Sequence, residues 1–390
     1  MVPKTDRIYY NDAYLREFEA RIVSTGIGEN TVYLDRTAFY PASGGQPFDL
    51  GAINGAAVKE VIDEGDRVAH VLSAPLAPGP VTCKIDWERR FDHMQQHTGQ
   101  HLISAVFEEL LGLKTVSFHL GAESSTIDLE GGVLDAAGAA RVERRANQVV
   151  AENRPVLVTY EDAAAVQGLR KPSEREGELR IVSIDGLDRS ACGGTHVRHT
   201  GEIGAVLIRK LEKIRQSVRA EFLCGGRAIA RARADYEALN KLAQMVSSSL
   251  DDAPATMAAQ LEAARAADKQ KRKLELEVAA YQGRELYQAT EPGADGMRRV
   301  SRRADRGNLE ELRAVAQSFT AQSHAIFLAA LNDPPSVLLA TSADSNVDAG
   351  KILKSALTEA GGRGGGTARM AQGAVPDAAK LEAVLEKLTE

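Results

Sequence analysis

The 390-residue sequence contains few of the features that define secreted, membrane-bound or disulfide-rich proteins. Its three cysteines are Cys83, Cys192 and Cys224, and a small, odd number argues against a disulfide framework. No apolar run approaches the roughly 20 residues that span a membrane, and the polar segment 1–7 lacks the pattern of a signal peptide. We therefore expect a globular, cytoplasmic protein of two or three domains.

The formal net charge of −6 excludes a protein that is basic throughout, as many nucleic-acid binders are. Positive charge is instead local. Segment 209–233 holds eight basic residues against Glu212 and Glu221, and smaller basic clusters lie at 269–273 and 298–306. Solvated surfaces and phosphate-binding surfaces both fit these clusters, and strong salt dependence of binding would indicate the second.

The most informative feature is a pair of short motifs whose side chains have the chemistry of zinc ligands. The first motif contains His97 and His101 within segment 89–111, where Leu102 and Val106 recur at helical spacing. This spacing predicts a helix that carries both imidazoles on one face, one turn apart. The residue after His97 is not glutamate, so the helix lacks the HExxH pattern of zinc proteases.

The second motif, Cys192-Gly-Gly-Thr-His196, follows about ninety residues later and lies outside any periodic run. Its glycines predict a tight turn that presents a thiolate and an imidazole together. One cysteine and three histidines suit Zn²⁺ best among the common metals. Each half alone could be an ordinary helix face or turn, whereas both together predict one zinc site formed by His97, His101, Cys192 and His196.

Hydrophobic periodicity predicts an α+β chain with four parts. Segment 1–90 alternates as short antiparallel strands of a small barrel, and segment 91–224 is a mixed region that holds both metal motifs. Segment 225–290 predicts two antiparallel helices, with a break at 251–254 that includes Pro254. Segment 291–390 reads as α/β, with strands near 325–329 and 337–341 and a helix at 347–360.

A run of glycines at 361–366, interrupted by Arg363, follows that last helix. It matches neither the phosphate loop of nucleotide triphosphatases nor the GxGxxG pattern of dinucleotide sites, so both are excluded. The run could hold a phosphate through backbone N–H groups, or it could be a mobile loop. Arg363 and Arg369 would suit phosphate contact in the first case.

Four motifs together resemble the alanyl-tRNA editing family. The helix motif and the Cys192 motif resemble the two zinc motifs of the editing domain of alanyl-tRNA synthetase. The remaining two are similar to the SGGQ loop of that domain and to the glycine-rich segment of the DHH-associated domain that follows it; they lie at 39–47 and 361–373. The first of these begins about forty residues into the chain, which leaves no room for an aminoacylation domain. The resemblance therefore implies a free-standing, long form of the editing protein.

The resemblance implies a zinc-containing hydrolase that removes serine or glycine from mischarged alanine tRNA. An alanine pocket cannot strongly exclude glycine or serine, so a second site must discriminate. The substrate pocket is then expected to contain Gln46, Ser117, His119 and Thr126, and tRNA contacts to involve Arg215, Arg219, Arg363 and Arg369. A tetrahedral ion with four protein ligands is closed, so it either releases a ligand or positions the terminal adenosine. The C-terminal region could also join two copies as a homodimer.

Alternatives from other classes stay open at this point. A non-catalytic tRNA-binding protein with structural zinc fits the closed ligand set. An editing domain of the threonine type carries a related histidine motif, but the resemblance of segments 39–47 and 361–373 argues against it. A hydrolase of free aminoacyl compounds would leave the basic clusters without a role.

Overall fold

The computed structural model describes residues 4–26, 28, 30–131, 134–214, 216–306 and 309–389. These residues form two compact units, 1–241 and 242–390. No described helix combines the length and apolar character needed to cross a membrane. The predicted boundaries near residues 90 and 290 fall inside these units and stay predictions.

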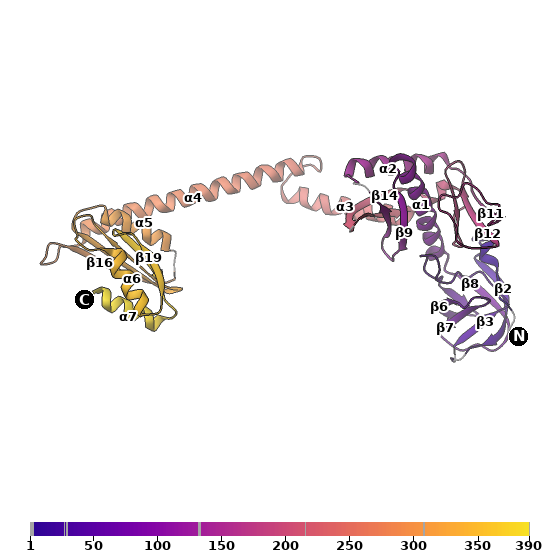
Figure 1. Ribbon diagram of the computed structural model, residues 1–390, viewed down its shortest axis with the longest axis horizontal. Helices are drawn as coiled ribbons and strands as arrows, with labels where there is room; N and C mark the ends of the chain where they lie inside the picture. Colours follow the sequence, from indigo (N-terminus) through magenta and orange to yellow (C-terminus); the bar gives the residue numbers. More distant parts are fainter. Residues whose placement is uncertain are drawn as a thin grey trace. The chain divides into compact units, whose positions relative to one another are not determined.

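Unit 1 begins with a closed antiparallel barrel, as the sequence pattern predicts (Figure 1). Along its first strand Phe18, Ala20 and Ile22 point into the barrel and alternate with exposed residues, because side chains of a strand face opposite sides in turn. In spatial order the barrel strands are β2 Glu17–Thr25, β3 Thr31–Leu34, β7 Val68–Leu72, β6 Ala56–Asp63, β5 Gly51–Ile53 and β8 Gly79–Ile85. The short β1 Asp6–Arg7 and β4 Arg36–Thr37 pair in parallel beside it.

Helix α1, Trp87–Leu111, follows the barrel and forms the centre of unit 1. It begins where the Asp86 carboxylate accepts a hydrogen bond from the Arg89 N–H, and it ends at Gly112 in the left-handed conformation. The core around it includes Leu102, Val106 and residues of two sheets. Those sheets are β14 Val206–Ile214, β15 Ser217–Cys224, β10 Ser125–Glu130 and β9 Lys114–Leu120 in one, and β11 Val156–Asp162, β12 Glu178–Ile184 and β13 Asp188–Ala191 in the other.

Three further helices complete unit 1 and begin unit 2. Helix α2, Ala136–Glu152, packs on α1, and α3, Gly225–Met245, continues from β15. After the predicted break, α4 runs from Ala253 to Ala289 with Pro254 in its first turn, where the missing N–H of proline costs no helical hydrogen bond.

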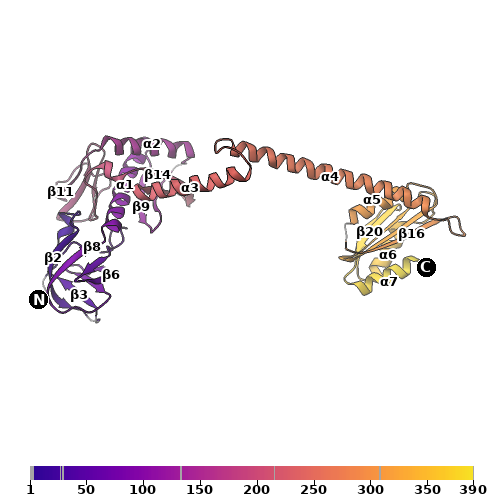
Figure 2. The same cartoon turned by 180° about the vertical axis from the view of Figure 1, so that it is seen from behind.

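Unit 2 is a mixed five-stranded sheet covered on both faces (Figures 1 and 2). Leu328 and Ala330 pack under α6 and α7, whereas Phe327 and Ala329 pack under α5 and the end of α4, as the alternation of a strand requires. The strands in spatial order are β16 Arg298–Arg306, β17 Ala325–Asp333, β18 Pro335–Thr341, β20 Met370–Ala374 and β19 Arg363–Gly366. The helices are α5 Leu309–Thr320, α6 Ala349–Glu359 and α7 Ala378–Thr389.

The sequence left two predictions open for the glycine run, a phosphate-holding loop and a mobile loop, and the structure shows a strand instead. Gly361, with φ 72°, ends α6, and residues 363–366 then form the edge strand β19 paired with β20. A Cβ on Gly366 would lie 2.2 Å from the carbonyl oxygen of Met370, and one on Gly364 would lie 2.5 Å from that of Gln372. Glycine therefore permits close approach of this strand to its neighbour, a requirement that composition alone does not reveal.

His70 of β7 makes the stability of unit 1 depend on pH. Burial lowers the pKa of His70 from 6.5 to about 4. Between these values the unfolded chain binds a proton that the folded chain excludes, so the free energy of unfolding should decrease as the pH is lowered from 6.5 to 4, by about 3 kcal/mol in all. Urea unfolding at pH 7 and pH 4.5 measures this loss through the fluorescence of Trp87, the single tryptophan.

His70→Gln should reduce that pH dependence, because glutamine does not titrate. His119→Gln, at an exposed position of the same unit, is the matched control. An equal loss of stability at low pH in the wild-type protein and in His70→Gln would contradict the prediction.

Candidate metal centre

Helix α1 presents His97 and His101 toward one point, as the spacing predicts. Both side chains are almost fully buried. The helix is held close to β15 at Gly99, because a Cβ there would lie 2.2 Å from the Cys224 sulfur. Cys224 and Cys83 are themselves buried in hydrophobic cores, so neither thiol joins the cluster.

The second pair of side chains comes from the irregular segment that follows β13. Arg180 of β12 donates to the backbone carbonyls of Cys192, at 2.7 Å, and Gly194, at 3.1 Å, which holds this segment in place. Gly194 lies against the His97 ring, where a Cβ would come within 2.2 Å of Cε1. The predicted turn therefore needs glycine at 194 for contact with the opposite motif.

The four candidate ligand atoms all lie within 4.8 Å of one another. The Cys192 sulfur lies 3.4 Å from Nε2 of His97 and 3.3 Å from Nε2 of His196. Bonds of about 2.0–2.3 Å to a tetrahedral ion place two ligand atoms roughly 3.5 Å apart. The separations and donor types therefore fit a metal ion bound by these four residues.

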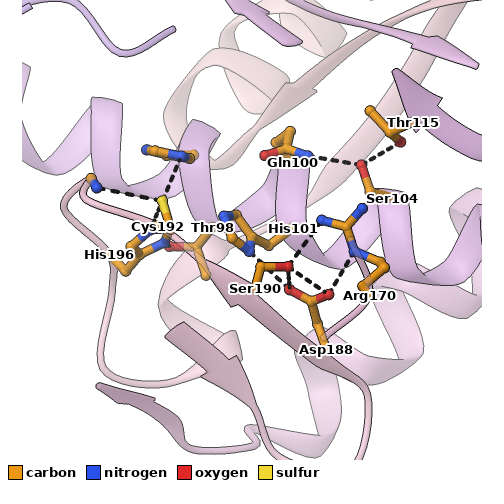
Figure 3. Close-up of polar contacts among 12 residues, drawn as sticks. Thr98, Gln100, His101, Ser104, Thr115, Arg170, Asp188, Ser190, Cys192 and His196 are labelled. Atoms are coloured by element: carbon orange, nitrogen blue, oxygen red, sulfur yellow. Dashed lines mark hydrogen bonds and ion pairs between the residues drawn. The ribbon is translucent and has the colours of Figure 1, made fainter. Parts of the chain in front are cut away.

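Each histidine of the cluster has its other nitrogen engaged, which fixes the direction of its ring. Nδ1 of His97 lies 2.8 Å from Oε1 of Gln46, and Nδ1 of His101 lies 2.8 Å from the Asp188 carboxylate. Nδ1 of His196 lies 3.1 Å from Oγ1 of Thr98 (Figure 3). All three rings consequently direct Nε2 toward the common centre.

The electrostatics of the cluster favour a thiolate. Burial opposes ionisation of Cys192, but the neighbouring His97 and His196 outweigh it and place the pKa of this thiol well below 9.0. Burial also acts against protonation of His101, yet its hydrogen bonds to Asp188 and Cys192 raise its pKa to about 9. A ligating imidazole is neutral, so metal binding competes with the proton on His101.

A cleft with a volume of about 630 Å³ adjoins the cluster. His97, His101 and Gln100 of α1 form one side, together with residues 115–118 of β9. Loop residues 43–44 and segment 170–176 line other parts of the cleft. Segment 192–194 also lines it and contributes Cys192, the third candidate metal ligand at the cleft surface. The arrangement places a candidate metal site beside a cavity of a size that holds a small organic group.

Comparison with known proteins gives matches along the whole chain. The family model described as Threonyl and Alanyl tRNA synthetase second additional domain matches residues 179–219, and the DHHA1 domain model matches residues 300–390. Alanyl-tRNA editing protein AlaX-L of Pyrococcus horikoshii is 30% identical over 407 residues, which cover 99% of this chain and 98% of that protein. The chain belongs to the alanyl-tRNA editing protein family.

Two other relatives agree with this placement. Alanyl-tRNA editing protein Aarsd1 of Mus musculus is 36% identical over 256 residues, covering 59% of this chain and 62% of that protein. Alanine–tRNA ligase of Pyrococcus abyssi is 29% identical over 413 residues, covering 100% of this chain and 44% of the ligase. The editing-family resemblance of the sequence motifs is thus confirmed.

The four residues expected in the substrate pocket of an editing protein lie in three places. Gln46 sits behind His97, and its amide also donates to Thr195 Oγ1 at 2.8 Å. Ser117 lines the cleft, with its hydroxyl donating to Asp128 at 2.6 Å. His119 and Thr126 face each other across β9 and β10, outside the residues that line the cleft.

The arginines expected to contact tRNA differ in how far their guanidinium groups are already engaged within the protein. Arg219 binds the Asp128 carboxylate through two nitrogens, at 2.7 and 2.9 Å, and Arg369 donates to the carbonyl of Thr341. Arg363 is exposed on β19. Arg215 lies outside the described residues.

The sequence pattern missed the side chains that orient the ligands. Asp188 binds His101, and Arg170 donates to Asp188 at 2.6 Å, while Thr98 binds His196. A usable signal was present, since ligating histidines usually bind a carboxylate or other acceptor, and Asp188 lies four residues before Cys192. The spacing did not indicate which histidine it would reach.

Gly194→Ala should weaken metal binding, because the added methyl group would displace the His97 ring. The expected loss in zinc affinity is at least about tenfold, as for other changes that misplace a ligand. Titration against a competing chelator measures it. Gly193→Ala is the matched control, since its Cβ would meet nothing closer than the Tyr10 ring at 3.8 Å. Equal affinities in the two variants would contradict the close contact at Gly194.

Proposed function

We propose that this chain is an aminoacyl-tRNA deacylase that hydrolyses the ester linking serine or glycine to the 3′ end of alanine tRNA. The observation that carries the proposal is the convergence of His97, His101, Cys192 and His196 at the wall of a cleft. The names of its relatives support the editing of alanyl-tRNA. A cytoplasmic location, where charged tRNA is used, goes with this function.

The proposed cofactor is one Zn²⁺ per chain, held by these four residues. When bound, the ion supplies positive charge that polarises the ester or orients the terminal adenosine. The side chains behind the ligands keep them aligned, and this rigidity supports precise placement of the ester. Aminoacyl esters are labile, so placement of water and ester supplies much of the needed acceleration.

The mouth of the cleft supports entry of a nucleic-acid end. Lys171 and Arg175 line it, both are exposed, and neither forms an ion pair with a described residue. Arg170 and Arg180 lie deeper and are occupied by Asp188 and by backbone carbonyls. Lys171 and Arg175 therefore suit contact with phosphates of the tRNA 3′ end.

Selection of serine requires polar groups that its hydroxyl satisfies and that alanine leaves unpaired. Ser117 is the predicted pocket residue nearest this need, because it lines the cleft and its hydroxyl is held by Asp128. The contacts of Gln46 favour a role in positioning His97. His119 and Thr126 stay predictions, with no contact that ties them to the cleft.

Cys192→Ala should lose zinc and deacylation together, because removal of a ligand opens the site. The expected decrease in the rate of release from seryl- and glycyl-tRNA is at least about 100-fold. The assay follows amino acid release from alanine tRNA charged with serine, glycine or alanine. Cys83→Ala, at a buried barrel thiol, is the matched control and should keep both properties.

The same experiment tests the non-catalytic alternative. Tight, salt-sensitive tRNA binding without release of any amino acid by the zinc-loaded wild-type protein would favour a tRNA-binding protein with structural zinc. Full zinc stoichiometry in Cys192→Ala would contradict the four-ligand site.

The C-terminal unit supports further tRNA contacts and a homodimer. Arg363 lies on an exposed edge strand without an ion pair to any described residue. Leu261, Leu274, Val278 and Tyr281 of α4 are exposed apolar residues that a second copy would cover. Light scattering of the full chain distinguishes one copy from two.

Arg363→Gln should weaken tRNA binding and reduce the slope of log affinity against log salt by about 1, because one phosphate contact is lost. Arg219→Gln should have a smaller effect, since the guanidinium of Arg219 is already paired with Asp128. Fluorescence anisotropy with labelled tRNA at several salt concentrations measures both. Equal slopes in Arg363→Gln and the wild-type protein would remove Arg363 from the interface.

A further inference from the structure

Gln100 is a cleft residue that neither the metal site nor the proposed tRNA contacts use. It lies three residues after His97 and directly before His101 on α1, and it lines the same cleft. Its side chain is only 6% exposed, so the amide is largely removed from bulk water. A polar group in this position needs hydrogen-bond partners.

One end of this amide is fixed by two hydroxyl groups. Nε2 of Gln100 donates to Oγ of Ser104 at 2.8 Å, and the Thr115 hydroxyl donates to the same oxygen at 2.7 Å. Ser104 Oγ therefore uses both lone pairs as acceptors, which leaves it no acceptor site for a further donor. Figure 3 shows the amide nitrogen of Gln100 facing Ser104 and its carbonyl oxygen facing away.

The other end of the amide, Oε1, accepts no hydrogen bond from the described residues, and it does not belong to their fully buried unpaired atoms. It is therefore a solvent-reached acceptor beside the candidate metal ligands. Two other acceptors beside the candidate ligands, on Gln46 and Asp188, are already used. Gln46 Oε1 binds His97 and the Thr195 N–H, and Asp188 binds His101, Arg170 and Ser190.

The substrate of the proposed reaction carries a group that needs such an acceptor. Serine, glycine and alanine esters all retain a free α-ammonium group, which only donates hydrogen bonds and is costly to desolvate unpaired. Arg170 and Arg180, which also line the cleft, offer it only donors. A neutral amide accepts from the ammonium without adding a carboxylate that would compete as a metal ligand.

We propose that Gln100, held by Ser104 and Thr115, is the residue that binds the α-ammonium group of the esterified amino acid. This inference rests on the proposed deacylase function. It assigns Gln100 to a feature common to all three amino acids, and therefore to recognition of an aminoacyl ester as such. Discrimination among the three side chains belongs to other residues.

Gln100→Met removes the acceptor while keeping the length of the side chain. Its kcat/KM for seryl- and glycyl-tRNA should fall by a similar factor of roughly 10 to 100, the usual effect of losing a hydrogen bond to a charged group. On an acetyl ester of the same tRNA, which is the glycyl ester without its ammonium group, the two proteins should differ by less than about threefold. Ser104→Ala, which releases the amide, should show a smaller loss with the same dependence on the ammonium group.

Zinc content is measured in every variant, and Gln95→Met is the matched control on the same helix. The Gln95 amide donates to the Glu202 carbonyl and does not line the cleft, so this change should leave the rates on all esters unaltered. Equal losses on glycyl and acetyl esters, with zinc retained, would show a structural role for Gln100 and overturn the inference.

Three other outcomes would also overturn it. A loss confined to seryl-tRNA would assign Gln100 to the serine hydroxyl. Unchanged rates in Gln100→Met would place the ammonium elsewhere in the cleft, for example at Glu178. A wild-type protein that releases no amino acid from any ester would instead overturn the proposed function itself, and the inference with it.

Discussion

The site depends on a buried ion pair between the barrel and helix α1. Arg90 and Asp49 are both fully buried, with Nε of Arg90 2.9 Å from the Asp49 carboxylate, and Arg90 also donates to the carbonyls of Ala13 and Ala38. A buried pair is tolerated only when such extra hydrogen bonds replace its lost hydration. Asp49 also accepts from the Tyr40 N–H at 2.6 Å, which closes the loop that contains Gln46. The pair thus positions Gln46, the residue that orients His97. His97 lies seven positions after Arg90 on α1.

The candidate metal centre is assembled from separate elements of unit 1. Helix α1 carries two ligands and Thr98, the loop after β13 carries the other two ligands, β13 carries Asp188, and the barrel loop carries Gln46. Each histidine is therefore held from behind by a different partner. These three contacts keep the wall of the cleft rigid. A histidine ring that could rotate would no longer direct its Nε2 toward the point that it shares with the other ligand atoms.

The basic segment 209–233 shows how tertiary contacts alter a prediction that is based on composition. Segment 209–233 has a local excess of basic residues, yet Arg227 binds Asp92 of α1, Arg219 binds Asp128 of β10, and Arg231 binds Asp235. Two of these acids lie far outside the segment and the third lies just beyond it. Lys171 and Arg175, which line the cleft, and Arg363 on β19 in contrast have no ion pair with a described residue.

The amino-acid sequence by itself determined the identity of the four candidate ligands, the two histidines on one helix face, the barrel strands and the family. These follow from residue chemistry and from periods of 3.6 and 2, which are local properties. Only the tertiary structure decided which side chains orient the ligands, where Gln100 points, which arginines stay unpaired, and that the glycine run is an edge strand. Gln46 and Thr195 meet across 149 positions, and Arg227 and Asp92 across 135. No spacing rule covers such separations, because hydrogen bonds and ion pairs form wherever packing brings donors and acceptors together.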